Sequence, residues 1–493
     1  MIKGKTKYLI GCLFILVFRM QGLAQPSSNL TKADSITWDL YVKQDWRALR
    51  NAANEALKQG IDFYYLRMRL GIASLELNKA ISAEQHFRQA LRQAEGDETA
   101  RQYLSLALHY QGKTTEAGSQ EKKLSDATRQ KVGIKHGFRL LSAHADAGNI
   151  FRENPKGLDF EQLTHEEGIF GQEHFYDDNQ FYDAGLYFLS GPVLQWYLGF
   201  QHISIQATDR FAYQEQQLQQ DSVVTNLFGQ NYYYSLQTNR QLKDFRHQLK
   251  QQAVYLQAQW AGSDRWWWLA ALQLCRVGRD FTLPDYTTVT VTDTLFFDPA
   301  SLSLGLFDTE IGTTIFSDVS WSTTDYSFGL FSRYHAGLLS FSGGITLASV
   351  NDTIVTQLNA GYQLRPFGNL TLTHQGELIY LNHDQQQQLA YRLSLAWKPG
   401  QKILLEADLL AGKLNNLSEQ YGYIVYNNPE VVNSRFEAGF SWLATPHLQL
   451  QLRYRLHQYQ RRYDYLSLEQ DELKTAYYPT TSHTIIGGII WIF

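Results

Sequence analysis

The ten residues LQLQLRYRLH, 448–457, decide the fold of this 493-residue chain. Leu448, Leu450 and Leu452 alternate with polar residues, so an extended strand here has one apolar and one polar face. The same alternation recurs in DYSFGLFSRYH (325–335), TIVTQLNAGYQLR (353–365) and AYRLSLAWK (390–398). Segments of about ten residues with this pattern are the signature of strands in outer-membrane β-barrels.

The connections between these segments separate a barrel from a soluble sandwich. Short turns at 190–192, 261–264, 333–337, 365–369, 398–401 and 444–447 alternate with connections that are mostly long, such as 208–247, 279–323 and 414–433. Barrels have tight periplasmic turns and longer external loops, whereas a sandwich has no reason to order its loops in this way. The sequence therefore predicts a barrel of about 14 strands over residues 131–493, or 16 if 279–323 adds a hairpin. A folded loop could plug a lumen of this size.

The C-terminal residues SHTIIGGIIWIF (482–493) fit a closing strand in contact with lipid. Ile489, Trp491 and Phe493 occupy alternate positions and so share one face. A terminal aromatic in this pattern resembles the signal by which the barrel-assembly machinery selects its substrates. We therefore expect that machinery and outer-membrane lipid to be partners of the chain.

The N-terminal residues 1–24 read as a secretory signal peptide. Lysines at 3, 5 and 7 precede an apolar core, and GLA stands before Gln25. The ending LAQ resembles the signal peptides of Bacteroidota. Cleavage would remove Cys12 and leave Cys275 alone, so no intrachain disulfide is expected. The net charge of -4 is too small to indicate a nucleic-acid partner.

The region 25–130 has helical rather than strand periodicity, and it repeats. Ala56, Ala90 and Leu124 are 34 residues apart, which is the period of the tetratricopeptide repeat. Leu70, Gly71, Ala83, Phe87 and Ala90 match the L-G, A, F and A positions of that repeat, so the region resembles a short tetratricopeptide solenoid; an unrelated helical bundle is the alternative. The resemblance implies helix packing at these five residues and a periplasmic protein partner. The fold class is therefore α+β multidomain: a short helical solenoid, then an antiparallel transmembrane barrel.

Charged residues on predicted inward positions concentrate on the last strands, and we call this set the charged wall: Glu377, Arg392, Glu406, Asp408, Arg435, Glu437, Arg453 and Arg455. If the short turns pair Trp397 with Ile403 and Trp442 with Leu448, then Arg392 faces Asp408 and Glu437 faces Arg453. The charged wall is either a constriction that screens a solute or a lattice of ion pairs that braces the barrel. The interleaved signs favour the lattice.

Enzyme signatures such as G-x-S-x-G, HExxH and a Walker loop are absent from the sequence, so neither an enzyme nor a cofactor or metal is expected. A periplasmic solenoid followed by an outer-membrane barrel resembles exopolysaccharide exporters and YaiO-type barrel proteins. The resemblance rests on domain order. It implies an outer-membrane location with the N-terminal region in the periplasm, and a channel for a polysaccharide or a small solute. The alternative is a non-conducting scaffold in which the barrel only anchors the solenoid.

Overall fold

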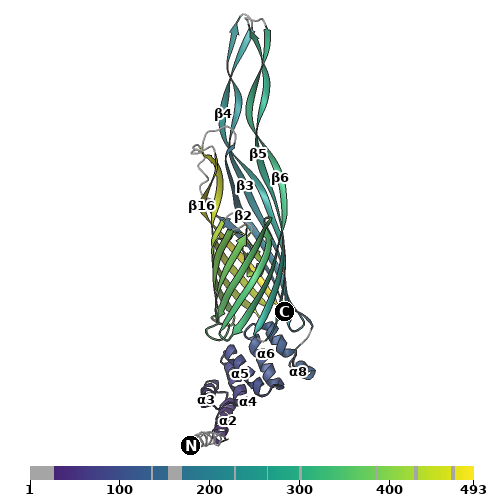
Figure 1. Ribbon diagram of the computed structural model, residues 1–493, viewed down its shortest axis with the longest axis vertical. Coiled ribbons are helices and arrows are strands. Elements are labelled where there is room, and N and C mark those ends of the chain that lie inside the picture. Colours follow the sequence, from purple (N-terminus) through teal and green to yellow (C-terminus); the bar gives the residue numbers. More distant parts are fainter. Residues whose placement is uncertain are drawn as a thin grey trace, which may run out of the picture.

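A computed structural model of the chain describes residues 27–134, 137–153, 169–226, 229–263, 265–298, 303–383, 386–426, 431–467 and 472–493. The expected signal peptide lies outside these residues. Within them, an N-terminal helical region is followed by a long barrel, and the strands β3 to β6 extend furthest from the barrel end that faces away from the helices (Figure 1). The predicted α+β architecture is confirmed.

The described part of the helical region contains seven helices in antiparallel succession. Their bounds are α2 Ser27–Val42, α3 Trp46–Lys58, α4 Tyr64–Glu76, α5 Ala80–Gln93, α6 Glu98–His109, α7 Thr114–Glu121 and α8 Asp126–Lys131. The starts of α3, α5 and α7 are spaced by 34 residues, as are those of α4 and α6. Asp45, Asp97 and Ser125 each cap a helix by accepting a backbone N–H. No helix among the described residues is both long and apolar enough to cross a membrane.

Small residues allow α4 and α5 to pack closely. Gly71 faces Phe87, and a Cβ on that glycine would lie 2.5 Å from the phenylalanine ring. Leu70, Ala83 and Ala90 are fully buried beside this contact. The five residues matched to the repeat pattern therefore all lie in the interior of the helical region, where a larger or charged side chain has no room.

Fourteen strands of the described chain form one closed antiparallel barrel, with β1 paired to β16. They are β1 Phe138–Arg152, β2 Ile169–Ser190, β3 Leu194–Asn226, β4 Gly229–Ala261, β5 Trp266–Asp298, β6 Ser303–Ala336, β7 Leu339–Val350, β8 Thr353–Leu364, β9 Leu372–His383, β10 Gln386–Trp397, β11 Ile403–Gly412, β14 Val431–Thr445, β15 Leu448–Ser467 and β16 Glu472–Ile492. Two further short strands, β12 Ser418–Glu419 and β13 Ile424–Val425, pair only with each other.

The prediction that 208–247 and 279–323 are loops was wrong, and so was the option of 16 strands. Residues 208–226 and 229–247 continue β3 and β4, and 279–298 and 303–323 continue β5 and β6. Pairing between β4 and β5 ends at Leu249 and Arg279, so beyond this level two separate hairpins leave the barrel (Figure 1). The alternating Thr and Val residues near 290 therefore lengthen wall strands instead of adding new ones.

The outer face of the barrel is apolar, the reverse of a soluble sheet. Leu378, Leu393, Phe436 and Leu452 are each more than two-fifths exposed on neighbouring strands, while the residues between them point inward. Ile489, Trp491 and Phe493 lie on the same outer face, each about half exposed or more. A closed barrel with an apolar outer band is the architecture that satisfies every backbone group inside hydrocarbon.

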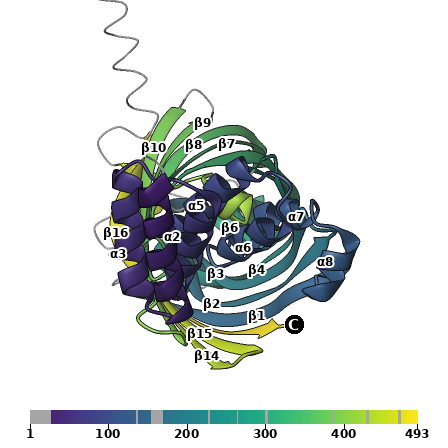
Figure 2. The ribbon, with the colours of Figure 1, turned by 90° about the horizontal axis from the view of Figure 1, so that it is seen from below.

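The helical region docks on the short-turn end of the barrel. Seen from that end, α5, α6 and α7 lie across the barrel opening (Figure 2). Hydrogen bonds join it to the β8–β9 turn: Ile81 N–H to the Gly368 carbonyl (3.0 Å), the Asn369 amide to the Asn78 carbonyl (2.8 Å) and Arg365 to the Gln111 carbonyl (3.2 Å). At the end of β6, the buried Nε2 of His335 lies 3.2 Å from Oε1 of Glu116 on α7. The region is therefore fixed at the mouth rather than tethered by a linker alone.

Candidate functional site in the lumen

The connection between β11 and β14 folds into the barrel instead of outward. We call its described residues 413–426 the insert. It contains β12, the 3₁₀ turn η2 (Gln420–Gly422) and β13. Asn416, Gln420, Tyr421 and Gly422 have positive φ, which allows the chain to reverse tightly at the tip. The sequence prediction of an external connection at 414–433 was thus wrong for the described part of it, because apolar and tyrosine side chains hold this segment against the inner wall.

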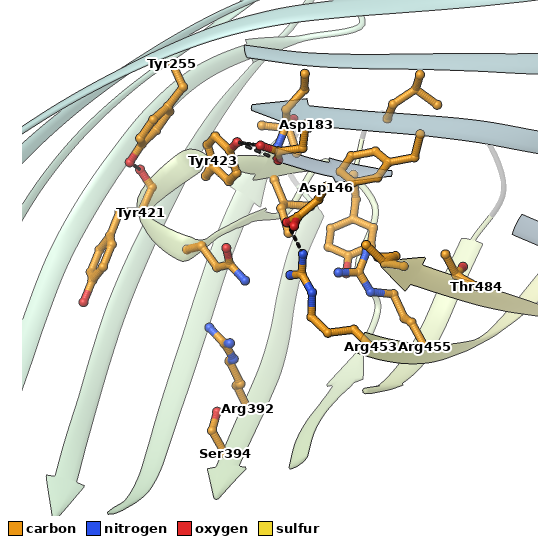
Figure 3. A pocket seen from close by; sticks show the side chains of 18 of the residues that line it. Asp146, Asp183, Tyr255, Arg392, Ser394, Tyr421, Tyr423, Arg453, Arg455 and Thr484 are labelled. Atoms are coloured by element: carbon orange, nitrogen blue, oxygen red, sulfur yellow. Dashed lines mark hydrogen bonds and ion pairs between the residues drawn. The ribbon is translucent and has the colours of Figure 1, made fainter. Parts of the chain in front are cut away.

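The tip of the insert reaches the opposite wall. The Tyr423 hydroxyl donates to Asp183 on β2 at 2.6 Å and accepts from Tyr197 on β3 at 2.9 Å. Gln273 on β5 donates to the Tyr423 carbonyl at 2.8 Å. Figure 3 shows this hydroxyl directed at the Asp183 carboxylate. The insert therefore crosses the lumen from β11 and β14 to β2.

Neighbouring strands hold the tip as well. Arg333 on β6 donates to the Tyr421 hydroxyl at 3.1 Å, and Tyr255 on β4 donates to the Tyr421 carbonyl at 3.2 Å. The rings of Tyr421 and Tyr423 pack into an aromatic cluster with Tyr197, Tyr255 and Phe331. The tip is thus held both by hydrogen bonds and by the packing of its aromatic rings.

The base of the insert is held by a buried ion-pair network. Glu419, which is 2% exposed, accepts from Arg435 at 2.5 Å and from the Tyr426 hydroxyl at 2.7 Å. Arg435 also contacts Asp408, and Arg392 donates to Asp408 at 2.7 Å. Because each charge has an opposite charge in contact, this buried network avoids the penalty of an isolated ion.

All eight residues of the charged wall lie on the inner side of the barrel. Besides the network above, Arg455 donates to Glu437 at 2.7 Å, and Glu377 accepts from the Asn359 amide at 2.7 Å. Glu406 and Arg453 flank the bare backbone of Gly439. Arg453 forms an ion pair with Asp146 on β1, across the strand β16 (Figure 3). The structure thus places six of the eight residues in ion pairs, whereas Glu377 and Glu406 have no ion pair within the described residues.

The predicted register of two hairpins was wrong by two residues. Trp397 pairs with Leu405 and Trp442 with Leu450, so Glu437 lies opposite Arg455 rather than Arg453. A register irregularity between Leu443 and Thr445 contributes to the second shift. A shift of two residues leaves every side chain on its own face, so Arg392 still reaches Asp408 along the diagonal.

The lumen beside the insert holds a cavity of about 770 Å³. Its walls carry charged-wall residues, the tyrosines of the insert and side-chain amides such as Gln257 and Gln451. Sequence reasoning missed Asp146, Asp183 and Glu419. The tyrosines at alternate positions in QYGYIVY (420–426) are the signal that this connection is not an ordinary solvated loop.

The chain is only weakly similar to known proteins. No family model and no curated protein matches the chain. Among solved structures it resembles the P. putida toluene transporter TodX (8% identity, 78% of this chain and 97% of that chain, TM-score 0.38). It also resembles a Pseudomonas aeruginosa FadL homologue (8%, 73% and 91%, 0.38) and a bacterial polysaccharide outer membrane secretin (10%, 72% and 98%, 0.30). Similarity this weak carries nothing about function.

The described residues contain no cluster of three or more His, Cys, Asp or Glu side chains arranged to hold a metal ion. Cys275 is a buried free thiol. The cavity instead offers charged side chains, amides and tyrosine hydroxyls as its polar groups.

Proposed function

We propose that this chain is an outer-membrane channel for a small solute, gated by the insert. The apolar outer band contacts lipid, and the short-turn end with its docked helices faces the periplasm. The observation that carries the proposal is the Tyr423–Asp183 hydrogen bond, which joins the insert to the opposite wall of the barrel.

The two ends of the insert differ in the way a gate requires. Its base packs Leu414 and Leu417, both almost fully buried, against Val355, Leu410 and Val432. Its tip is held by the aromatic cluster and by hydrogen bonds. Each hydrogen bond between neutral groups contributes about 0.5–1.5 kcal/mol, and each one to a charged group about 1.5–3 kcal/mol. The apolar base serves as the fixed end, and the polar tip exchanges its partners for water when it opens.

The cavity size favours a small solute over a polymer. A volume of about 770 Å³ lies within the roughly 300–1,000 Å³ range of small-molecule sites. A polysaccharide strand would need the tip to leave the lumen entirely. We therefore propose a small solute. Transport of a polysaccharide is the alternative result that the transport assay would detect.

The helical region is proposed to act as a tetratricopeptide-like adaptor that holds a periplasmic protein at the channel mouth. The 34-residue spacing of its helices and its docking on the turns support this role. In the lumen, the charged wall is proposed to brace the barrel and to set the local potential along the path of the solute.

Single-channel conductance of the full chain in planar bilayers tests the gate. Replacing residues 415–425 with a short glycine linker removes the tip but leaves β11 paired with β14 from Ile403 to Ala411. We expect this variant to conduct steadily, and Tyr423→Phe with Asp183→Asn to open more often than the parent. Tyr391→Phe, which changes a half-exposed tyrosine on the outer face, is the matched control and should behave as the parent.

Two outcomes discriminate between the alternatives. A linker variant that inserts correctly and conducts no ions would refute the channel and favour the non-conducting scaffold. A linker variant that passes dextrans as readily as monosaccharides would favour the polymer over the small solute.

A further inference from the structure

Along the barrel axis, the inward side chains change from charged to apolar. On β9, β10 and β11, the inward side chain two residues beyond the last charged position, away from the short turns, is apolar: Ile379 after Glu377, Ala390 after Arg392 and Leu410 after Asp408. These apolar residues are all buried. A water-filled barrel interior is polar throughout, so this apolar layer, which we call the upper collar, needs an explanation.

One arc of the upper collar is explained by the insert. On β7–β11 and β14 its residues form a single cluster with Leu414 and Leu417, which cover Val350, Val355 and Leu381. This arc is a packing surface for the base of the gate.

The other arc, on β1–β5, is not part of that cluster. Ile150, Ile203, Ile205, Leu249 and Val277 line the cavity instead. Ile205 and the buried Leu249 and Val277 pack with Tyr176 and Ala207 in a separate cluster that contains no residue of the insert. Ile424, Val425 and Val432 line the same cavity from the insert side. The cavity therefore has aliphatic walls on both sides at this level.

One polar side chain stands among these aliphatic walls without a partner. Gln251 on β4 is 9% exposed and lines the cavity, and its amide makes no hydrogen bond within the described residues. Its neighbours along the inner face of β4 are Leu249 and Ala253. Because this amide borders the cavity, it can donate a hydrogen bond to a bound ligand or accept one from it.

Two of the arginines that line the cavity are neutralised by ion pairs. Arg453 is paired with Asp146, and Arg455 with Glu437. Arg152 on β1 lies over the rings of Tyr176 and Tyr459. Arg333 and Glu377 line the cavity from β6 and β9, outside the β1–β5 arc. A charged ligand that lay against the aliphatic side chains of the arc would lose its hydration without gaining an opposite charge from them, which is unfavourable.

We propose that the β1–β5 arc of the upper collar, with Gln251, is a binding site for a neutral, mainly apolar small molecule that carries one or two hydrogen-bonding groups. The inference rests on the proposed function in taking this ligand to be the transported solute, but binding itself requires no conduction. A binding assay therefore fails or succeeds independently of the conductance assay.

Equilibrium binding of tritiated 1-naphthol to the full chain in nanodiscs, with empty nanodiscs subtracted, tests the site. We expect saturable binding that Ile205→Glu weakens at least tenfold, because it places a charge in the aliphatic arc. Gln251→Leu should weaken binding by about two- to tenfold, corresponding to the loss of one hydrogen bond. Gln449→Glu, which adds a charge on an inward position of β15 that does not line the cavity, is the matched control and should bind as the parent.

Heat-modifiability of each variant establishes that the barrel is folded, since inward positions tolerate polar substitutions. No saturable binding above empty nanodiscs would overturn the proposal. Equal loss of binding in Ile205→Glu and Gln449→Glu would also overturn it, and so would 1-naphthalenesulfonate binding as tightly as 1-naphthol.

Discussion

The helical region buries apolar side chains and exposes polar ones, whereas the barrel exposes apolar side chains on its outer face and buries charged ones inside. In the helical region Leu70, Ala83 and Phe87 lie inside, and polar residues face water. In the barrel Leu393 and Leu452 face outward, while Arg435 is fully buried inside. Helices satisfy their backbone groups locally, whereas the barrel needs its last strand to close on its first. Damage should therefore stay local in the helical region and spread through the whole barrel.

Deleting Trp491–Phe493 tests the global side of this contrast and should have the largest effect. Trp491 and Ile492 pair with Ala143 and Ser142 on β1, and the Phe493 N–H bonds the Leu141 carbonyl. Loss of this contact shortens the pairing that closes the barrel and removes the expected assembly signal, so we expect no inserted barrel. Heat-modifiability on gels measures it, with Phe493→Leu as the control; a truncated barrel that is correctly inserted would contradict the closure argument.

Ala83→Glu tests the local side. The side chain of Ala83 has no exposed surface and packs with Phe87 and Leu104, so a carboxylate there would be buried without a partner. We expect the helical region to lose about 4 kcal/mol or more while the barrel still inserts. Loss of the circular dichroism signal at 222 nm and heat-modifiability report the two parts separately. Asn51→Glu on the exposed side of α3 is the control, and unchanged helical stability in Ala83→Glu would show that the packing assignment is wrong.

As the pH is lowered, we expect the helical region to unfold at a higher pH than the barrel, because Glu84 becomes protonated. Burial would raise the pKa of Glu84, but Lys113 at 2.9 Å and Arg88 lower it from 4.5 to about 2. Because the folded-state pKa lies below the unfolded one, the stabilisation is present above pH 4.5 and is lost as the pH falls toward 2; it amounts to about 3 kcal/mol.

Thermal melts of the 222 nm signal between pH 2 and pH 7 check this expectation. Glu84→Gln should lower stability at pH 7 and flatten the dependence below pH 4.5. The exposed Glu55→Gln should change it by less than about 1 kcal/mol. A pH profile of Glu84→Gln that matches the parent would assign the acid sensitivity to other groups.

The smallest effect is expected for charge reversal in the charged wall. Arg392→Glu with Arg453→Glu replaces two inward positive charges by two negative ones beside Asp408 and Asp146. In the variant whose residues 415–425 are a glycine linker, reversal potentials in a salt gradient should shift toward cation selectivity at low ionic strength and less at high. Arg265→Glu, on an exposed short turn, is the control, and an equal shift there would mean that the charged wall does not set the potential.

Particular residues show which features could be predicted from the sequence alone. Alternation at Leu448–Leu456 predicted the strand, its faces and the inward position of Arg453, because side-chain direction in a strand depends only on parity. The 34-residue spacing predicted that the helices repeat, and the match to the repeat pattern predicted that Gly71 lies at a helix contact. Both signals are local, so they can be read without knowing what the strand or helix touches.

Only the tertiary structure determined which residues contact one another. Arg453 pairs with Asp146, which is 307 positions away, because closure brings β1 and β16 together. The insert turns inward because Tyr423 finds Asp183 and Leu414 finds Val432, contacts that no periodicity encodes. The register of the hairpins depended on turns and a bulge, and the apolar upper collar on which inward residues share a level. Parity fixes the face of each residue locally, but its neighbours depend on the closure and register of the whole barrel.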